Sequence, residues 1–356
     1  MSDALIKSAI SHWGARFVAN GVALTDFEEV CAACNSWDDW CKAWSAKAGV
    51  HEALGREALA KGRHLSAGEH LQRAGVYYHF GKFLFTQDIP QMQAAHLKAV
   101  ECRKLALPHL SPSGERVAIP FEGKTLYGIL RKPAGIAKPP VMIMCCGLDS
   151  AKEETDAYEQ PFLARGIAIL VFDGPGQGEA EYDFPIRGNY ETAVKSVCDF
   201  IETRTDVDSA RIGLWGVSLG GYYAPRAAAF EKRVRACIAL SGPYDMGANW
   251  DSLPALTRDT FRVRSHAATD AAGKANASTL SLKGFAERIT CPLFVVTGKQ
   301  DRVVPWQDAE RLAREAKGPV EYLAIEDGNH VANNRGYKWR LQTADWMAER
   351  LGAVGG

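Results

Sequence analysis

The chain has 356 residues, of which 47% are hydrophobic and 24% are charged. This composition is typical of a globular protein long enough for two domains. Its 42 basic residues balance its 42 acidic residues, which removes any bulk electrostatic argument for nucleic acid or an anionic membrane as a partner. The longest apolar stretches, such as 141–146 and 167–172, have the length of strands. The first residues lack the pattern of a signal peptide, so we expect a cytoplasmic protein.

The nine cysteines are odd in number, and several lie within apolar runs. Reduced thiols therefore fit better than disulfides. Cys31 and Cys34 have the spacing of one pair of zinc ligands, and Cys41 follows them. A second pair at metal spacing is missing, whereas structural zinc needs four ligands. We expect no metal site and no cofactor.

The chain changes character near residue 110. In residues 1–107 apolar side chains recur at intervals of three and four, as in Leu5, Ile10, Trp13 and Phe17, which predicts a bundle of about five helices. A Ser-Pro-Ser-Gly cluster at 111–114 marks the boundary. We therefore predict a helical cap or lid domain over 1–112 and a catalytic domain over 113–356.

Strands and helices alternate after this boundary. A hairpin is predicted from 117–121 and 125–131. Apolar strands are predicted at 141–146, 167–172, 211–215, 236–240, 293–297 and 320–325, and helices at 153–165, 190–203, from 219, 306–316 and 338–351. Strands that are apolar on both faces and separated by helices indicate an α/β fold with a mostly parallel, doubly wound sheet. The interval 244–289 is too long for a simple connection, so we expect a helical insert there that shapes the site entrance.

The run Gly-Val-Ser-Leu-Gly at 216–220 directly follows the strand that ends near Trp215, and a helix follows it. This strand–turn–helix context is that of a nucleophile elbow, in which a serine sits on a sharp, strained turn. The alternative is a glycine-rich turn with an incidental serine. In this context we predict that Ser218 is a nucleophile.

A serine nucleophile needs a base, and histidine suits that role because its pKa lies near neutrality. Only His266 and His330 follow Ser218 in the chain. His330 lies just beyond the last predicted strand, where sites form in open α/β sheets, whereas His266 lies in the irregular insert. We predict that His330 is the base.

The acid that orients the histidine is expected between the serine and the histidine. Asp301 follows the predicted strand 293–297 and is favoured over Asp245, which also fits a turn or a helix cap. The oxyanion hole is expected to use the backbone N–H of Leu219, with Leu148 in the loop after strand 141–146 as the second donor.

Together with the elbow and the loops of Asp301 and His330, the run Asp-Gly-Pro-Gly-Gln-Gly at 173–178 resembles one branch of the α/β-hydrolases. That branch carries a helical N-terminal domain and includes the fermentation-respiration-switch protein and 2,6-dihydroxypseudooxynicotine hydrolase. The resemblance covers the whole chain, most strongly from about residue 115. It implies hydrolysis of a carbon–carbon bond next to a ketone, in an aromatic or β-diketone-like catabolic substrate.

The resemblance further implies an assisting acid in the substrate pocket, within residues 244–251. Tyr244, Asn249, Trp250 and Asp251 are therefore the candidate substrate-binding residues. An amide at Asn249 would be a departure from an acid, and Asp251 is an equal candidate.

Two other functions stay open from the sequence: an ester or thioester hydrolase, and a non-catalytic regulatory protein on a hydrolase fold. The expected partner is a small-molecule substrate, and a neutral, aromatic-rich helical domain is compatible with a homodimer. The aromatics of that domain are expected chiefly in its core, with pocket lining as the alternative.

Overall fold

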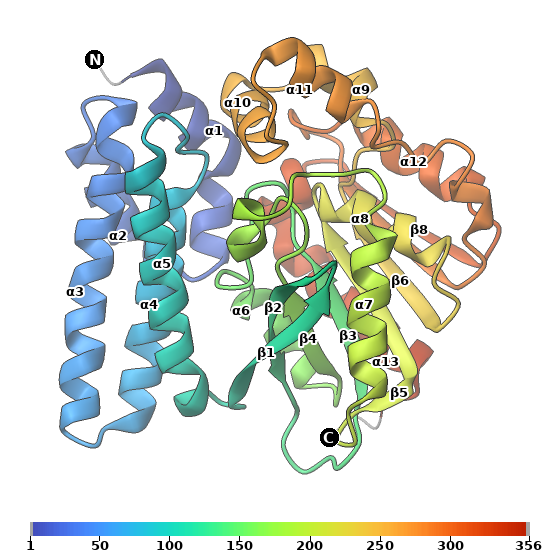
Figure 1. Ribbon diagram of the computed structural model, residues 1–356, viewed down its shortest axis with the longest axis horizontal. Coiled ribbons are helices and arrows are strands. Elements are labelled where there is room, and N and C mark those ends of the chain that lie inside the picture. The colour runs from blue at the N-terminus through green and yellow to red at the C-terminus, as the bar shows by residue number, and fades with distance from the viewer. Residues whose placement is uncertain (1–2, 354–356) are drawn as a thin grey trace. The chain divides into compact units, whose positions relative to one another are not determined.

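The computed structural model describes residues 3–353 and divides the chain into two compact units (Figure 1). The helical unit comprises Met1–Arg116 together with Glu153–Ala157, and the sheet unit comprises Val117–Lys152 and Tyr158–Gly356. The short segment Glu153–Ala157 falls outside the division expected from the sequence. The chain therefore enters the helical unit twice.

The helical unit contains five α-helices in its described part: α1 (Ala4–Ala19), α2 (Leu24–Ala33), α3 (Trp40–Ala60), α4 (His64–Lys82) and α5 (Ile89–Ala106). Aromatic side chains form its core. The ring of Phe17 lies 4.2 Å from that of Phe80 and 5.4 Å from those of Trp44 and Phe27, measured between centroids. Since Phe17, Trp44 and Phe80 are fully buried, the helical spacing of these residues reflects packing.

The sheet unit is built on eight strands in the order β1-β2-β4-β3-β5-β6-β7-β8. Their bounds are β1 (Gly114–Phe121), β2 (Lys124–Arg131), β3 (Pro140–Cys145), β4 (Ala168–Phe172), β5 (Asp208–Val217), β6 (Val234–Leu240), β7 (Leu293–Gly298) and β8 (Val320–Ile325). β2 pairs antiparallel with β4, and all strand pairs from β4 to β8 are parallel. The predicted α/β fold with a mostly parallel sheet is confirmed.

Helices cover both faces of this sheet (Figure 1). They are α6 (Asp156–Leu163), α7 (Glu191–Glu202), α8 (Gly220–Ala228), α12 (Trp306–Glu315) and α13 (Arg340–Leu351). Successive side chains of β5 pack against opposite faces of the sheet, because side chains alternate along a strand. Leu214 shares a core cluster with Ala224 of α8, whereas the ring of Trp215 lies 5.1 Å from that of Tyr158 in α6.

The helical insert expected at 244–289 is present, whereas the helix expected at 153–165 begins later than predicted. The insert after β6 holds α9 (Met246–Asn249), α10 (Ala255–Arg264) and α11 (Asp270–Ala277), as a helical insert requires. The helix expected at 153–165 begins only at Asp156, because the preceding residues form a turn in which the side chain of Glu154 is bound by the helical unit. Within residues 3–353 no helix is both long enough and apolar enough to cross a membrane.

Candidate functional site

Ser218 lies at the turn between β5 and α8 in a left-handed backbone conformation, with φ of 55°. A non-glycine residue rarely adopts this conformation, and it persists only where its surroundings enforce it. Here the Ser218 N–H donates to the Leu240 carbonyl at 2.8 Å, and the Ser218 carbonyl accepts from the Gly221 N–H at 2.7 Å. These bonds hold the serine at the carboxyl end of the parallel strands.

The glycine on either side of the elbow has no room for a side chain. A Cβ atom at Gly216 would lie 1.9 Å from the Gly220 carbonyl oxygen, and one at Gly220 would lie 2.1 Å from the Cys145 carbonyl oxygen. The close approach of β5, α8 and β3 at this turn therefore requires glycine at both positions.

The three residues expected to act together form one hydrogen-bonded chain. His330 Nε2 lies 2.9 Å from Ser218 Oγ, and His330 Nδ1 lies 2.7 Å from Asp301 Oδ2. The Asp301 side chain is fully buried and that of His330 is 6% exposed. With Nδ1 donating to the carboxylate, Nε2 is free to accept a proton from the serine hydroxyl.

The loop that carries His330 is also strained. Val331 and Ala332 have φ values of 61° and 48°, and Ser241 at the end of β6 has φ of 45°. The Val331 N–H donates to Ser241 Oγ at 3.2 Å, which ties the histidine loop to the strand beside Ser218. Strained conformations thus gather around the hydrogen-bonded chain, as they do at many functional sites.

One candidate oxyanion donor directly follows Ser218 in the chain, and the other lies in the loop after β3. Leu219 is the N-cap residue of α8, so its N–H has no acceptor within the helix. Leu148 follows Gly147, at which a Cβ atom would lie 3.1 Å from Ser218 Cβ. The loop after β3 therefore packs directly against the elbow.

The rival residues have other partners. The Asp245 side chain accepts from the Ala248 N–H at 3.0 Å and caps α9. His266 Nε2 lies 2.8 Å from the Glu181 carbonyl oxygen. Neither residue has a hydrogen bond to Ser218 or His330 in the part of the chain that the structure describes.

Tyr244 and Asn249, two candidates for substrate binding, are bound to α12. The Tyr244 hydroxyl donates to Glu315, and the Asn249 amide donates to Asp308 Oδ2 at 2.7 Å. Asp308 was not anticipated from the sequence, because it is one of several charged residues on an amphipathic helix. Burial raises its pKa, against opposing hydrogen bonds from the Tyr244 N–H and the Asn249 amide.

Trp250 and Asp251, the other two candidates, belong to the insert. Trp250 is 1% exposed, and its ring meets that of Phe261 edge-on at 5.5 Å. Asp251 is exposed and forms an ion pair with Lys274 at 2.7 Å. Within residues 3–353 none of the four candidates is hydrogen-bonded to Ser218, His330 or Asp301.

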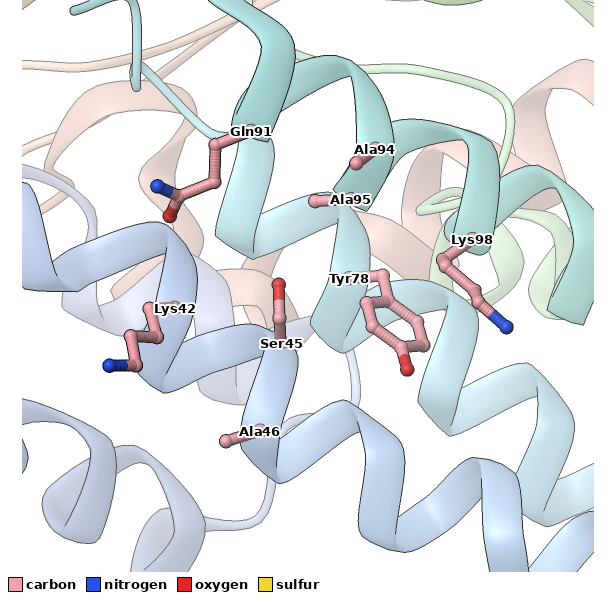
Figure 2. A pocket seen from close by; sticks show the side chains of 8 residues that line it. All are labelled: Lys42, Ser45, Ala46, Tyr78, Gln91, Ala94, Ala95 and Lys98. Atoms are coloured by element: carbon pink, nitrogen blue, oxygen red, sulfur yellow. The ribbon is translucent and has the colours of Figure 1, made fainter. Parts of the chain in front are cut away.

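A separate groove of about 500 Å³ lies in the helical unit, between α3, α4 and α5 (Figure 2). Alanines and the stem of Tyr78 line much of it, with Lys42 and Lys98 at its sides. Lys98 pairs with Glu52 at 3.1 Å, and Tyr78 donates to the same carboxylate at 2.8 Å. Lys98, Glu52 and Tyr78 thus bind one another at this side of the groove.

A strained serine, a histidine within reach of it and a buried carboxylate behind the histidine, on a mostly parallel sheet, are the geometry of an α/β-hydrolase. Residues 154–354 match the model of the prolyl oligopeptidase family. The chain belongs to this family of α/β-hydrolases.

Relatives within this group are hydrolases. The chain is 32% identical over 351 residues to 2,6-dihydropseudooxynicotine hydrolase of Paenarthrobacter nicotinovorans, which covers 96% of this chain and 92% of that protein. A crystal structure of the 2,6-dihydroxy-pseudo-oxynicotine hydrolase is similar over 96% of this chain and 97% of that one, with a TM-score of 0.88 and 30% identity. The hydrolyase poxO of Penicillium oxalicum is 35% identical over 60% of this chain, and this match spans 53% of its length.

Proposed function

We propose that this protein is a serine hydrolase in which Ser218, His330 and Asp301 act as a catalytic triad, and that it cleaves a carbon–carbon bond next to a ketone. The single observation that carries the first half is the hydrogen-bonded chain from Asp301 through His330 to Ser218. The near full-length similarity to 2,6-dihydropseudooxynicotine hydrolase supports the second half.

The proposed reaction begins when Ser218 Oγ attacks the carbonyl carbon while His330 Nε2 takes its proton. The N–H groups of Leu219 and Leu148 donate to the oxyanion of the tetrahedral species. In the collapse that follows, the bond to the leaving carbon breaks, and protonated His330 returns the proton to that carbon. Water, deprotonated by His330, then hydrolyses the acyl-enzyme and frees Ser218.

A carbon leaving group is a strong base, so it needs a proton donor as the bond breaks. Asn249 cannot supply a proton as a carboxylic acid would, because an amide is not an acid near neutral pH, and it instead donates to Asp308. This supports a substrate whose leaving carbon is stabilised by its own electron-withdrawing groups, as in an aromatic ketone or a β-diketone.

To test this proposal, the purified protein is assayed in parallel with acylated dihydroxy-aromatic ketones and with p-nitrophenyl esters. We expect cleavage of the ketone, and loss of about a thousandfold or more of that activity in Ser218→Ala and His330→Ala. Retention of activity within about tenfold would contradict the triad.

A second candidate is an ester or thioester hydrolase, since the same three residues serve an oxygen or sulfur leaving group. The amide at Asn249, which is hydrogen-bonded to Asp308, favours it, because an oxygen or sulfur leaving group depends less on a carboxylic acid donor than a carbon leaving group does. Fast ester turnover without any ketone cleavage would select this candidate. A non-catalytic protein would fail to react with a fluorophosphonate, whereas we expect labelling that disappears in Ser218→Ala.

The nine free cysteines fit a reducing compartment. A cytoplasmic location is therefore part of the proposal, and the similarity to a hydrolase of a small molecule supports a small-molecule substrate.

A further inference from the structure

The run Asp-Gly-Pro-Gly-Gln-Gly at 173–178 follows β4, and the triad chemistry leaves it without a role. Gln177, within this run, is 1% exposed. Its side chain reaches across to the loop after β3, which carries the candidate oxyanion donor Leu148. Buried side-chain amides are retained where their hydrogen bonds are satisfied, so the partners of this amide show what it does.

The Gln177 amide is bound at both ends. Its Nε2 donates to the carbonyl oxygens of Cys146 at 2.5 Å and Gly147 at 2.9 Å. Its Oε1 accepts from the Tyr190 hydroxyl at 2.6 Å and from the Gly174 N–H at 3.2 Å. Because donors face Oε1, the NH₂ group must face the two carbonyls, and the orientation of the amide is determined by its contacts.

These bonds determine the direction of the neighbouring N–H groups. In a trans peptide the C=O of one residue and the N–H of the next point in opposite directions. Since the Gly147 carbonyl points to Gln177, the Leu148 N–H points away from Gln177. The same reasoning applies to the Cys146 carbonyl and the Gly147 N–H.

The next peptide is held from another element. Arg264, at the end of α10, is 3% exposed and donates through Nη1 to the Leu148 carbonyl. Three consecutive carbonyls, of residues 146–148, are therefore bound by two buried side chains from outside the loop.

The same run also holds the far end of this loop. Asp173 is fully buried and accepts from the Lys152 N–H at 3.0 Å and from Lys152 Nζ at 2.6 Å. Residues 146–152 are thus bound near both ends by one turn after β4, which leaves the loop little freedom to rotate its peptides.

We propose that Gln177 is a positioning residue that pre-orients the oxyanion hole by holding the Cys146 and Gly147 carbonyls, an inference that rests on the proposed function. Oxyanion donors stabilise a transition state well only when they are oriented before the reaction, because reorientation would cost part of the stabilisation. Gln177 does not touch the substrate. It acts through the Leu148 N–H.

The test uses the full chain, p-nitrophenyl butyrate as substrate and phenylboronic acid as the probe of the oxyanion hole, because the boronate formed on Ser218 is tetrahedral. Gln177→Met keeps the length of the side chain and removes its polar atoms. We expect kcat to fall about 10- to 100-fold, a fraction of the effect of deleting one donor. KM should change less than about twofold, and the affinity for phenylboronic acid should weaken by the same factor as kcat. Gln342→Met on the exposed face of α13 is the matched control and should retain wild-type values.

The variant Gln177→Glu distinguishes a positioning role of Gln177 from a purely structural role. The introduced carboxylate still accepts from Tyr190 but cannot donate to the loop, whereas its protonated form can. Burial beside two carbonyl oxygens raises the pKa of the introduced carboxyl. The ratio of variant to wild-type kcat should therefore rise as the pH is lowered from about 9 to about 6, which a purely structural role would not produce.

Unchanged kcat and phenylboronic acid affinity in Gln177→Met would overturn the inference, and so would a fall in kcat without weaker phenylboronic acid binding. If Gln177→Met does not fold, a pH-independent ratio for Gln177→Glu overturns it. Esterase activity that persists in Ser218→Ala would instead contradict the proposed function, so the two failures are distinguishable.

Discussion

At the scale of single residues, the Asp301 carboxylate is hydrogen-bonded through both of its oxygens. One oxygen accepts from the Val303 and Val304 N–H groups at 2.8 and 2.9 Å, and the other lies 2.7 Å from His330 Nδ1. The two backbone donors fix the orientation of the carboxylate, so its other oxygen faces the imidazole of His330. This arrangement selects the histidine tautomer with the proton on Nδ1.

Asp301→Asn should therefore lower kcat by about 10³- to 10⁴-fold, because the amide presents a donor to His330 and favours the wrong tautomer. The side-chain oxygen can still accept from Val303 and Val304, so the melting temperature should stay close to that of the wild type. Esterase kinetics and a thermal melt check both expectations.

The matched control for this change is Asp245→Asn, at the rival aspartate. Asparagine caps helices as well as aspartate does, so activity and stability should be nearly unchanged. Equal losses in the two variants would show that Asp301 has no special relation to His330.

At the scale of elements, the site lies at the carboxyl ends of neighbouring parallel strands. β5 and β6 run parallel and end beside each other at Val217 and Leu240, and the next residue of each, Ser218 and Ser241, is left-handed. Parallel strands bring their carboxyl ends to one edge of the sheet, and tight turns there expose side chains above it. The strain is offset by backbone hydrogen bonds such as the one from Ser218 to Leu240.

Replacement of glycine by alanine should have opposite effects on stability at Gly220, in the crowded elbow, and at Gly49, in α3. Gly220→Ala should lower the free energy of unfolding by about 1–3 kcal/mol and reduce activity more than about tenfold, because the added methyl would push β3 away from α8. Gly49→Ala lies within α3, where a Cβ atom would be 3.7 Å from the Tyr78 hydroxyl oxygen. It should stabilise the protein by up to about 1 kcal/mol.

Urea unfolding followed by circular dichroism, together with esterase assays, measures both variants. A Gly220→Ala protein with full activity would mean that the elbow can relax, contrary to the close approach of Cys145.

At the scale of the whole molecule, the path of the chain joins the two units by more than one connection. Glu154 belongs to the helical unit and is 1% exposed. Both of its carboxylate oxygens accept from Arg16 at 2.6 Å, and Asn20 and His79 bind it at 2.6 and 2.9 Å. Burial alone would raise the pKa of Glu154, but the charge and hydrogen bonds of Arg16 and His79 outweigh it and hold that pKa well below its ordinary value.

Because the folded-state pKa of Glu154 is lowered, its contribution to stability is present above the ordinary carboxyl pKa of 4.5 and is lost as the pH falls below it. Glu154→Gln should therefore destabilise the protein by about 3–5 kcal/mol near neutral pH, since it leaves Arg16 buried without its counter-charge. The difference from the wild type should shrink as the medium becomes more acidic.

Denaturant midpoints measured across a series of pH values check this expectation. Glu57→Gln is the control, because Glu57 is exposed and its ion pair with Lys61 one turn away is solvated, so little stability depends on its charge. A constant difference between Glu154→Gln and the wild type at all pH values would contradict the role of the charge.

Local signals in the sequence predict much of the fold and the arrangement of the three central side chains. A turn of Gly-Val-Ser-Leu-Gly between an apolar strand and a helix predicts an elbow without knowledge of any contact. The order of Ser218, Asp301 and His330, each just after a strand, then places them on one edge, because parallel strands end together. The structure holds His330 within hydrogen-bond distance of both Ser218 and Asp301.

Long-range partners lie beyond such signals. Nothing in the sequence near Glu154 indicates that Arg16 and His79 bind it, or that Gln177 reaches back to Cys146. Tyr244 and Trp250 likewise have aromatic side chains suited to a pocket, yet one donates to Glu315 and the other is buried in the insert.

The sequence by itself determined the α/β class, the strand ends and the candidate nucleophile, base and acid, because these depend on periodicity, turn chemistry and chain order. Only the tertiary structure decided which side chains orient the loop after β3, where the segment around Glu154 belongs and what the residues from 244 to 251 contact. Those answers depend on pairs of groups far apart in the chain, whose meeting is set by packing rather than by local pattern.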